Sequence, residues 1–180
     1  QLDGNFPLFV AAWRGHLGAV QRMLRHPRLD VNLTMPDGAT AVYIACQVGH
    51  AEIVEELLRH PELDVNKAMH DGVTPLFIAA WMGHSEIVRL LMEHPQLEVN
   101  KGMPDGSTPI FIAAYKGRME IIRLLLTHPK LDAESGKTPL DAARRKGDSN
   151  IEKLLMQNGA YRVDWKDFSS ETPTFNPYLD

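Results

Sequence analysis

The 180-residue sequence predicts an all-α repeat solenoid, and three observations lead to this prediction. Asp-Gly pairs begin similar segments at positions 3, 37, 71 and 105, so the interval is 34 residues each time. Each segment carries two short stretches with apolar residues at helical spacing. Proline, glycine and His-Pro pairs mark the expected starts and ends of these stretches at matching positions in the copies. A fixed period of this size is typical of stacked repeat architectures.

The first helix of the unit is clearest in the third copy, which reads TPLFIAA. Thr74 is expected to cap this helix and Pro75 to occupy its first position, where the missing N–H has no helical partner to lose. Ala79 and Ala80 are small, so a neighbouring helix can approach closely. Gly83 is expected to end the helix.

A second helix is predicted to start near Ser85, with Ile87 and Leu91 on one apolar stripe. The His94-Pro95 pair ends it, because the residue before a proline is pushed out of the helical region. The next residues are predicted to be extended and to form a finger loop, which the following Asp-Gly pair closes with a turn. One unit cannot bury its own apolar stripe, so the units are expected to stack.

Five such units divide most of the chain, the fifth after a shortened connection. We expect the array to span residues 1–160 and a non-repeat tail to span 161–180. The expected units are approximately 3–36, 37–70, 71–104, 105–134 and 135–160.

Three motifs make the unit specific: TPLFIAA in the first helix, GHSEIVRLL across the turn into the second, and Asp-Val-Asn before the finger. With these motifs the chain resembles the ankyrin-repeat family over residues 3 to about 160. The resemblance implies stacked ankyrin helix-turn-helix units with extended finger loops. It also implies a binding scaffold, with the partner on the concave and finger face, and no enzymatic activity. The first two copies, NFPLFVAA and ATAVYIAC, lack part of the TPL motif.

Composition and charge argue against several classes of protein. The net charge is −4, whereas nucleic acids and anionic membranes usually require a basic face, so neither partner is expected. No apolar run reaches membrane-spanning length. The start, QLDGNFPLF, has no signal-peptide pattern and no initiator Met, so we expect an excised or processed chain. The single cysteine, Cys46, is expected to be a buried filler, and the lack of a possible internal disulfide favours an intracellular location.

No catalytic, cofactor-binding or metal-binding residue is predicted. The sequence has no phosphate-binding loop, HExxH or CxxC motif. Seven of the eight histidines recur at two positions of the unit, and stacked units are about 10 Å apart, too far to share a zinc ion. The exception is His70, on a finger. The repeated Asp residues are expected to form turns, although a row of carboxylates could also meet a basic partner.

The candidate partner-binding residues vary between copies at positions expected to face the groove. The two residues before each helix-ending glycine vary most, and aromatic and Arg side chains dominate interface energetics. The alternative is that the aromatic rings pack on the fingers and cover the repeat junctions. The predicted binding residues are Trp13, Arg14, Gln47, His70, Trp81, Met82, Tyr115, Lys116, Arg145 and Lys146.

The candidate surface changes character along the chain. It carries aromatic residues in earlier units, whereas the fifth unit is basic, with Arg145 and Lys146 among its cations. A terminal repeat needs a polar outer face, so a solvated cap is one interpretation. The other is a groove that fits a peptide with one apolar part and one acidic part.

One modification is implied by the resemblance alone. The asparagine of Asp-Val-Asn can be hydroxylated in ankyrin repeats, and Asn32 and Asn66 each have a Leu eight residues upstream, similar to the preferred context. Both are therefore candidate substrates, provided that such an enzyme shares their cell.

The tail from Tyr161 to Asp180 has no helical stripe but many aromatic residues. Three roles are open for it. It could extend the cap of the last repeat, lead into a further domain or serve as a peptide ligand, or occupy the chain's own groove as an autoinhibitory strand.

The sequence therefore predicts an intracellular, monomeric module that binds another protein or peptide without a cofactor. A preformed surface favours binding, because little ordering is needed on association. One alternative is a regulatory or substrate-docking region of a larger multidomain protein, such as an enzyme, whose other domain is absent from this sequence. Another is a rigid spacer.

Overall fold

The computed structural model describes residues 6–159, and this part of the chain contains helices, turns and loops but no β-strand. Its ten helices form five successive pairs, so the predicted all-α repeat solenoid is confirmed. The helices are α1 (Pro7–Trp13), α2 (Leu17–Leu24), α3 (Ala41–Val48), α4 (Ala51–Leu58), α5 (Pro75–Met82), α6 (Ser85–Met92), α7 (Pro109–Tyr115), α8 (Met119–Leu126), α9 (Pro139–Lys146) and α10 (Ser149–Gln157).

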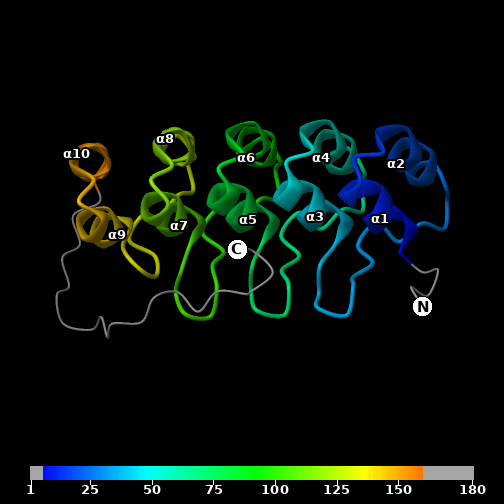
Figure 1. The fold of residues 1–180 in the computed structure, drawn as a ribbon, viewed down its shortest axis with the longest axis horizontal. Coiled ribbons are helices and arrows are strands. Elements are labelled where there is room, and N and C mark those ends of the chain that lie inside the picture. Colours follow the sequence, from blue (N-terminus) through cyan, green and yellow to red (C-terminus); the bar gives the residue numbers. More distant parts are fainter. Residues whose placement is uncertain (1–5, 160–180) are drawn as a thin grey trace.

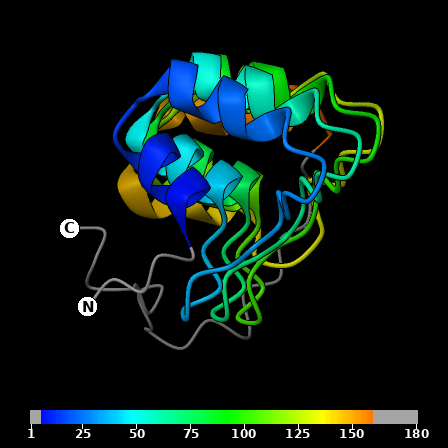
Figure 2. The ribbon, with the colours of Figure 1, turned by 90° about the vertical axis from the view of Figure 1, so that its right-hand side faces the viewer.

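The helix pairs stack side by side into an elongated array (Figure 1). The first helix of each pair contacts the first helix of the next, and the second helices from α2 to α8 do the same. Figure 2 looks along the array and shows the finger loops leaving to one side and extending past the layer of first helices. The first helices therefore lie between the second helices and the finger tips.

Threonine caps fix the starts of the central first helices. Thr40, Thr74 and Thr108 each accept a hydrogen bond from the backbone N–H three residues later, at 3.2–3.3 Å. In α1 this position is Phe6, which has no side-chain acceptor. Such a cap is worth about 1 kcal/mol, so α1 begins with less stabilisation than its neighbours. Gly83 ends α5 in the left-handed conformation, as predicted.

One continuous apolar core runs through all five units. Small residues such as Ala79 and Ala113 are fully buried in the first helices, where they allow neighbouring helices to approach closely. Cys46 fills one of these positions and is itself fully buried, as the sequence predicts. Ile87 and Leu91 bury the predicted stripe of α6.

Asparagine side chains join each unit to the next. Asn66 donates from Nδ2 to the carbonyl oxygen of Gln96 at 2.7 Å, and its Oδ1 accepts from the N–H of Glu98 at 2.9 Å. The same two contacts join Asn32 to Glu62 and Asp64, and Asn100 to Lys130 and Asp132. The asparagine of each Asp-Val-Asn or Glu-Val-Asn motif is thus a bridge between units.

The residue before α4, α6 and α8 forms another bridge between units. His50 Nε2 lies 3.3 Å from the carbonyl oxygen of Trp13, and His84 Nε2 lies 3.2 Å from that of Gln47. Arg118 takes this place in the fourth unit and donates to the end of α5 at 3.2 Å. These contacts support the prediction that the recurring histidines belong to the framework.

The His-Pro pairs share one geometry after the second helices. The Nδ1 atoms of His26, His60, His94 and His128 each accept a backbone N–H from two residues later, at 3.2–3.4 Å. An accepting ring nitrogen carries no proton. Burial also lowers the pKa of His94 and His128, which favours the neutral ring in the fold.

Some predictions fall outside the described residues. These are the Asp-Gly pair at positions 3 and 4 and the three roles considered for the tail at 161–180. Within residues 6–159, each helix is too short or too polar to traverse a lipid bilayer.

Candidate partner-binding surface

The carboxyl ends of the five first helices form a row along the array, because equivalent positions of stacked units lie next to one another. We call this row the helix-end ridge. Its members are Trp13, Arg14, Gln47, Val48, Trp81, Met82, Tyr115, Lys116, Arg145 and Lys146. The ridge includes every predicted binding residue except His70.

The first two units give the ridge an exposed apolar end. Trp13 is 50% exposed, Val48 at the end of α3 is 37% exposed, and Val10, one turn before Trp13, is 36% exposed. The guanidinium carbon of Arg14 lies 5.6 Å from the centre of the Trp13 ring, within the range of a cation–π contact. Gln47 is half-buried. This end therefore presents a large ring with apolar side chains on the neighbouring turns.

Trp81 is placed differently, because only 7% of its surface is exposed. The Nζ atom of Lys116, from the next unit, lies 3.7 Å from the centre of its ring. At this distance the ammonium is attracted to the ring face. The geometry agrees with the alternative stated above, in which the ring covers a repeat junction. A partner here would meet Lys116 and the half-buried Met82 before it met the ring.

The same contact between a ring and a lysine of the next unit recurs one unit later. Tyr115 is half-buried, and the Nζ atom of Lys146 lies 4.4 Å from the centre of its ring. Lys116, Arg145 and Lys146 are exposed. Apart from Arg14, which is also exposed, the exposed ridge residues therefore change from apolar at α1 and α3 to basic at α7 and α9.

These lysine–ring pairs join two units, which is why a comparison of positions within one unit missed them. In each pair, the ring lies two positions before the glycine that follows the first helix. The lysine lies directly before the corresponding glycine of the next unit. The corresponding partner of Trp13 is position 48, which is a valine. The next unit thus supplies no cation to Trp13, which is 50% exposed, and Val10 and Val48 join the candidate site.

His70 lies apart from the ridge, on the finger row. It is exposed, and its N–H donates to the carbonyl oxygen of Asp37 at 3.0 Å, which joins two neighbouring fingers. Asp37, Asp71 and Asp105 each accept a backbone N–H from two residues later, as expected of turn residues. The finger row is therefore built mainly from contacts that shape the fingers themselves.

Comparison with known families assigns the chain to a class. A family model described as "Ankyrin repeats (3 copies)" matches residues 8–102 and also residues 95–167. The chain belongs to the ankyrin-repeat family. A search of curated proteins gave no match. Ankyrin repeats generally act as protein-interaction modules and are typically not enzymes.

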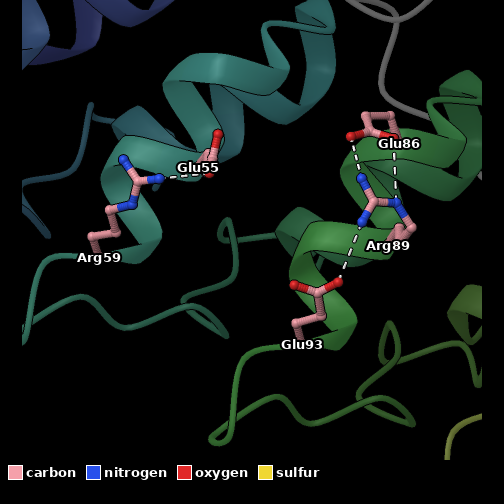
Figure 3. Close-up of polar contacts among 5 residues, drawn as sticks. All are labelled: Glu55, Arg59, Glu86, Arg89 and Glu93. Atoms are coloured by element: carbon pink, nitrogen blue, oxygen red, sulfur yellow. Dashed lines mark hydrogen bonds and ion pairs between the residues drawn. The ribbon is translucent and has the colours of Figure 1, made fainter.

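The outer face of the ankyrin array carries charged pairs on its second helices (Figure 3). Arg59 lies 2.6 Å from Glu55, and Arg89 pairs with Glu86 and Glu93. These side chains are all at least 48% exposed. Exposed pairs within one helix contribute about 0.3–0.5 kcal/mol each. We therefore interpret this face as solvated surface.

Within residues 6–159, no group of three or more His, Cys, Asp or Glu side chains is arranged to hold a metal ion. The thiol of Cys46 is fully buried, and burial raises its pKa, so the thiol stays protonated. The ankyrin array thus offers a surface for recognition at the ridge and an unreactive thiol in its core.

Proposed function

We propose that the array binds an extended segment of another protein along the helix-end ridge. Apolar side chains of the segment contact the α1–α3 end, and acidic side chains contact the α7–α9 end. The observation that carries this proposal is the change in exposed residues, from Trp13 and Val48 at one end to Lys116, Arg145 and Lys146 at the other.

Each end offers a type of contact that recognition uses. A large exposed ring with apolar neighbours supplies area to bury, and Trp is enriched among residues that carry binding energy. Ammonium and guanidinium groups attract carboxylates and orient an approaching partner. Lys116 and Lys146 already rest on aromatic rings. Their side chains therefore lose less rotamer freedom when they pair with a carboxylate.

The size of the ridge limits the partner. From α1 to α9 there are four unit spacings of about 10 Å, or about 40 Å in total. An extended peptide rises about 3.3 Å per residue, so about 12 residues cover the ridge. The proposed ligand is therefore a short segment with apolar and acidic halves.

The proposal is tested by capturing partners from a lysate of the source cells with two ridge variants. One is Trp13→Ala, and the other reverses charge with Lys116→Glu and Lys146→Glu. Trp81 is left unchanged, because truncating a buried ring would disturb folding. Arg89→Ala on the outer face is the control. Both ridge variants are expected to lose a protein that the wild type and the control retain.

Calorimetry with the identified protein then separates the two ends. Trp13→Ala is expected to weaken binding by about 2 kcal/mol, or about 30-fold, with little dependence on salt. The charge reversal is expected to weaken binding most at low salt. Equal retention by all ridge variants would contradict the ridge as the binding site.

A further inference from the structure

We propose that the chain's own segment 160–180 occupies the helix-end ridge and competes there with the partner. This inference rests on the proposed function, because it names an occupant for the same surface. Residues 160–180 lie outside the part of the chain that the structure describes.

The sequence of this segment has the two properties that the ridge favours. It contains four acidic and two basic residues, so its net charge is −2. It also contains aromatic residues that can cover apolar surface. Its acidic residues are Asp164, Asp167, Glu171 and Asp180, and its aromatic residues are Tyr161, Trp165, Phe168, Phe175 and Tyr178.

The order of these residues also matches the ridge. The described chain ends at Gly159, directly after α10, and α10 packs against α9 at the basic end. Three of the four carboxylates come first, between positions 164 and 171. The rings of Tyr161, Trp165 and Phe168 and the cations of Arg162 and Lys166 lie in the same stretch, and Phe175 and Tyr178 follow. A segment that runs from α9 toward α1 would therefore bring carboxylates to Lys116 and Lys146 before it brings rings to the apolar end.

The lengths are compatible with this path. An extended chain spans at most about 3.3–3.6 Å per residue, so the five residues from Gly159 to Asp164 reach about 17 Å. The sixteen residues from Gly159 to Phe175 reach about 55 Å. The ridge from α9 to α1 is about 40 Å long. The carboxylates can thus reach the basic end and Phe175 can reach the apolar end.

Attachment to the same chain makes even a weak contact effective. A short flexible tether holds a ligand at an effective concentration of about millimolar. A segment with an intrinsic dissociation constant in that range would occupy the ridge about half of the time. The partner's apparent affinity would fall by the fraction of ridges that are occupied. Release of the segment would therefore raise the affinity for the partner.

The test uses a spin label on the 180-residue chain. Ser170→Cys adds a reactive thiol, whereas Cys46 is fully buried with a raised pKa and does not compete for the reagent. Paramagnetic broadening is then read from the amide signals of the isotope-labelled protein. We expect signals of Tyr115 and Lys116 on the ridge to lose intensity, and signals of Glu55 and Arg89 on the outer face to keep it.

Two controls keep this test decisive. Removing three carboxylates of the segment with Asp164→Asn, Asp167→Asn and Glu171→Gln is expected to restore the ridge signals, whereas Thr172→Ala with Thr174→Ala is expected to leave the broadening in place. A mixture of spin-labelled and isotope-labelled chains should show no broadening if the contact lies within one chain.

Three results would overturn the inference: no broadening on the ridge, broadening on the outer face in its place, or equal broadening in the mixed sample, which would make a second copy the source. The experiment needs no partner. Loss of partner binding in the Trp13→Ala variant without ridge broadening would therefore refute the segment and leave the proposed function intact. Ridge broadening with unchanged partner capture would refute the proposed function instead.

Discussion

At the scale of single residues, several side chains serve the neighbouring unit more than their own. Both the Oδ1 and the Nδ2 atom of the Asn66 amide are bonded to the next unit, and the residue is only 8% exposed. Asn32 makes the same contacts but is more exposed. Hydroxylation of these two residues stays a prediction. Both side chains are bonded to the next unit, and Asn32 is the more accessible of the two.

Removing the buried bridge should destabilise the array. Asn66→Ala leaves the carbonyl of Gln96 and the N–H of Glu98 without their partner, so we expect the free energy of unfolding to fall by about 2–3 kcal/mol. Asn32→Ala is the matched control, with a smaller loss, because Asn32 is less buried than Asn66 and water can replace its hydrogen bonds more readily. Urea denaturation measures both. Equal losses would mean that burial of the bridge has no energetic effect.

Two glycines allow the effect of backbone strain on stability to be distinguished from the effect of a contact between units. Gly49 and Gly147 both end a first helix with positive φ, at 88° and 69°. A Cβ at position 49 would lie 2.8 Å from the His84 ring, whereas a Cβ at position 147 would have no atom within 4 Å. Both alanine variants should lose about 1–2 kcal/mol from strain. Thermal melting should show the larger decrease for Gly49→Ala, and equal decreases would exclude a role for the His84 contact.

At the scale of elements, local sequence signals defined the helices well. The TPL motif predicted the threonine cap and the proline start of α5, and glycine and His-Pro predicted where the helices end. The burial of Trp81 was not predictable in this way. Lys116, which contacts the ring, is 35 residues later and reaches it only after two units have stacked. The residues that start and end a helix act locally, whereas the exposure of a ridge residue depends on contacts between stacked units.

The last finger contact predicts a pH effect. Lys137 Nζ lies 2.7 Å from Asp105 Oδ2, and the Lys137 N–H donates to the carbonyl oxygen of Gly106 at 2.7 Å. Burial opposes the ionisation of Asp105, but hydrogen bonds from Lys137 and Ser107 outweigh it, so the pKa of Asp105 is lowered.

A carboxyl group whose pKa is lower in the folded than in the unfolded state adds stability above its unfolded pKa, and this stability is lost as the pH falls through the folded pKa. The wild type should therefore exceed Lys137→Met in stability at neutral pH, and the difference should shrink below about pH 4. Urea denaturation across the pH range measures this difference, in which the titration of the histidines cancels. Lys101→Met removes a more exposed pair and should show little effect. A difference that is constant with pH would contradict the role of Asp105.

At the scale of the whole molecule, each unit is stabilised by its neighbours. The period and the motifs were enough to predict this architecture, because one unit cannot bury its own stripe. The period and the motifs could not predict how the two ends of the array differ. That difference arises from particular residues, such as Phe6 in place of a cap and Asp148, which caps α10 in place of a bridging histidine.

The position of a core residue along the array should determine how the protein unfolds. Leu91 in the third unit and Leu155 in the fifth are both fully buried. Truncation of either to alanine removes about 2–5 kcal/mol of core packing. Leu155→Ala should mainly raise hydrogen exchange in α9 and α10, because a terminal unit can open alone. Leu91→Ala should raise exchange across several units. Identical exchange patterns would indicate a single cooperative block.

The bridges between units also have a consequence for recombination. Because each asparagine and each second-helix bridge reaches its partner at nearly the same sequence offset, removal of one exact period, such as residues 71–104, would bring Asn66 to Lys130 and Asp132 and preserve the bridging pattern. The ridge would change, since Lys116 would then stand beside Gln47 instead of Trp81. Gene rearrangements in register could thus alter what the array recognises while its framework remains compatible.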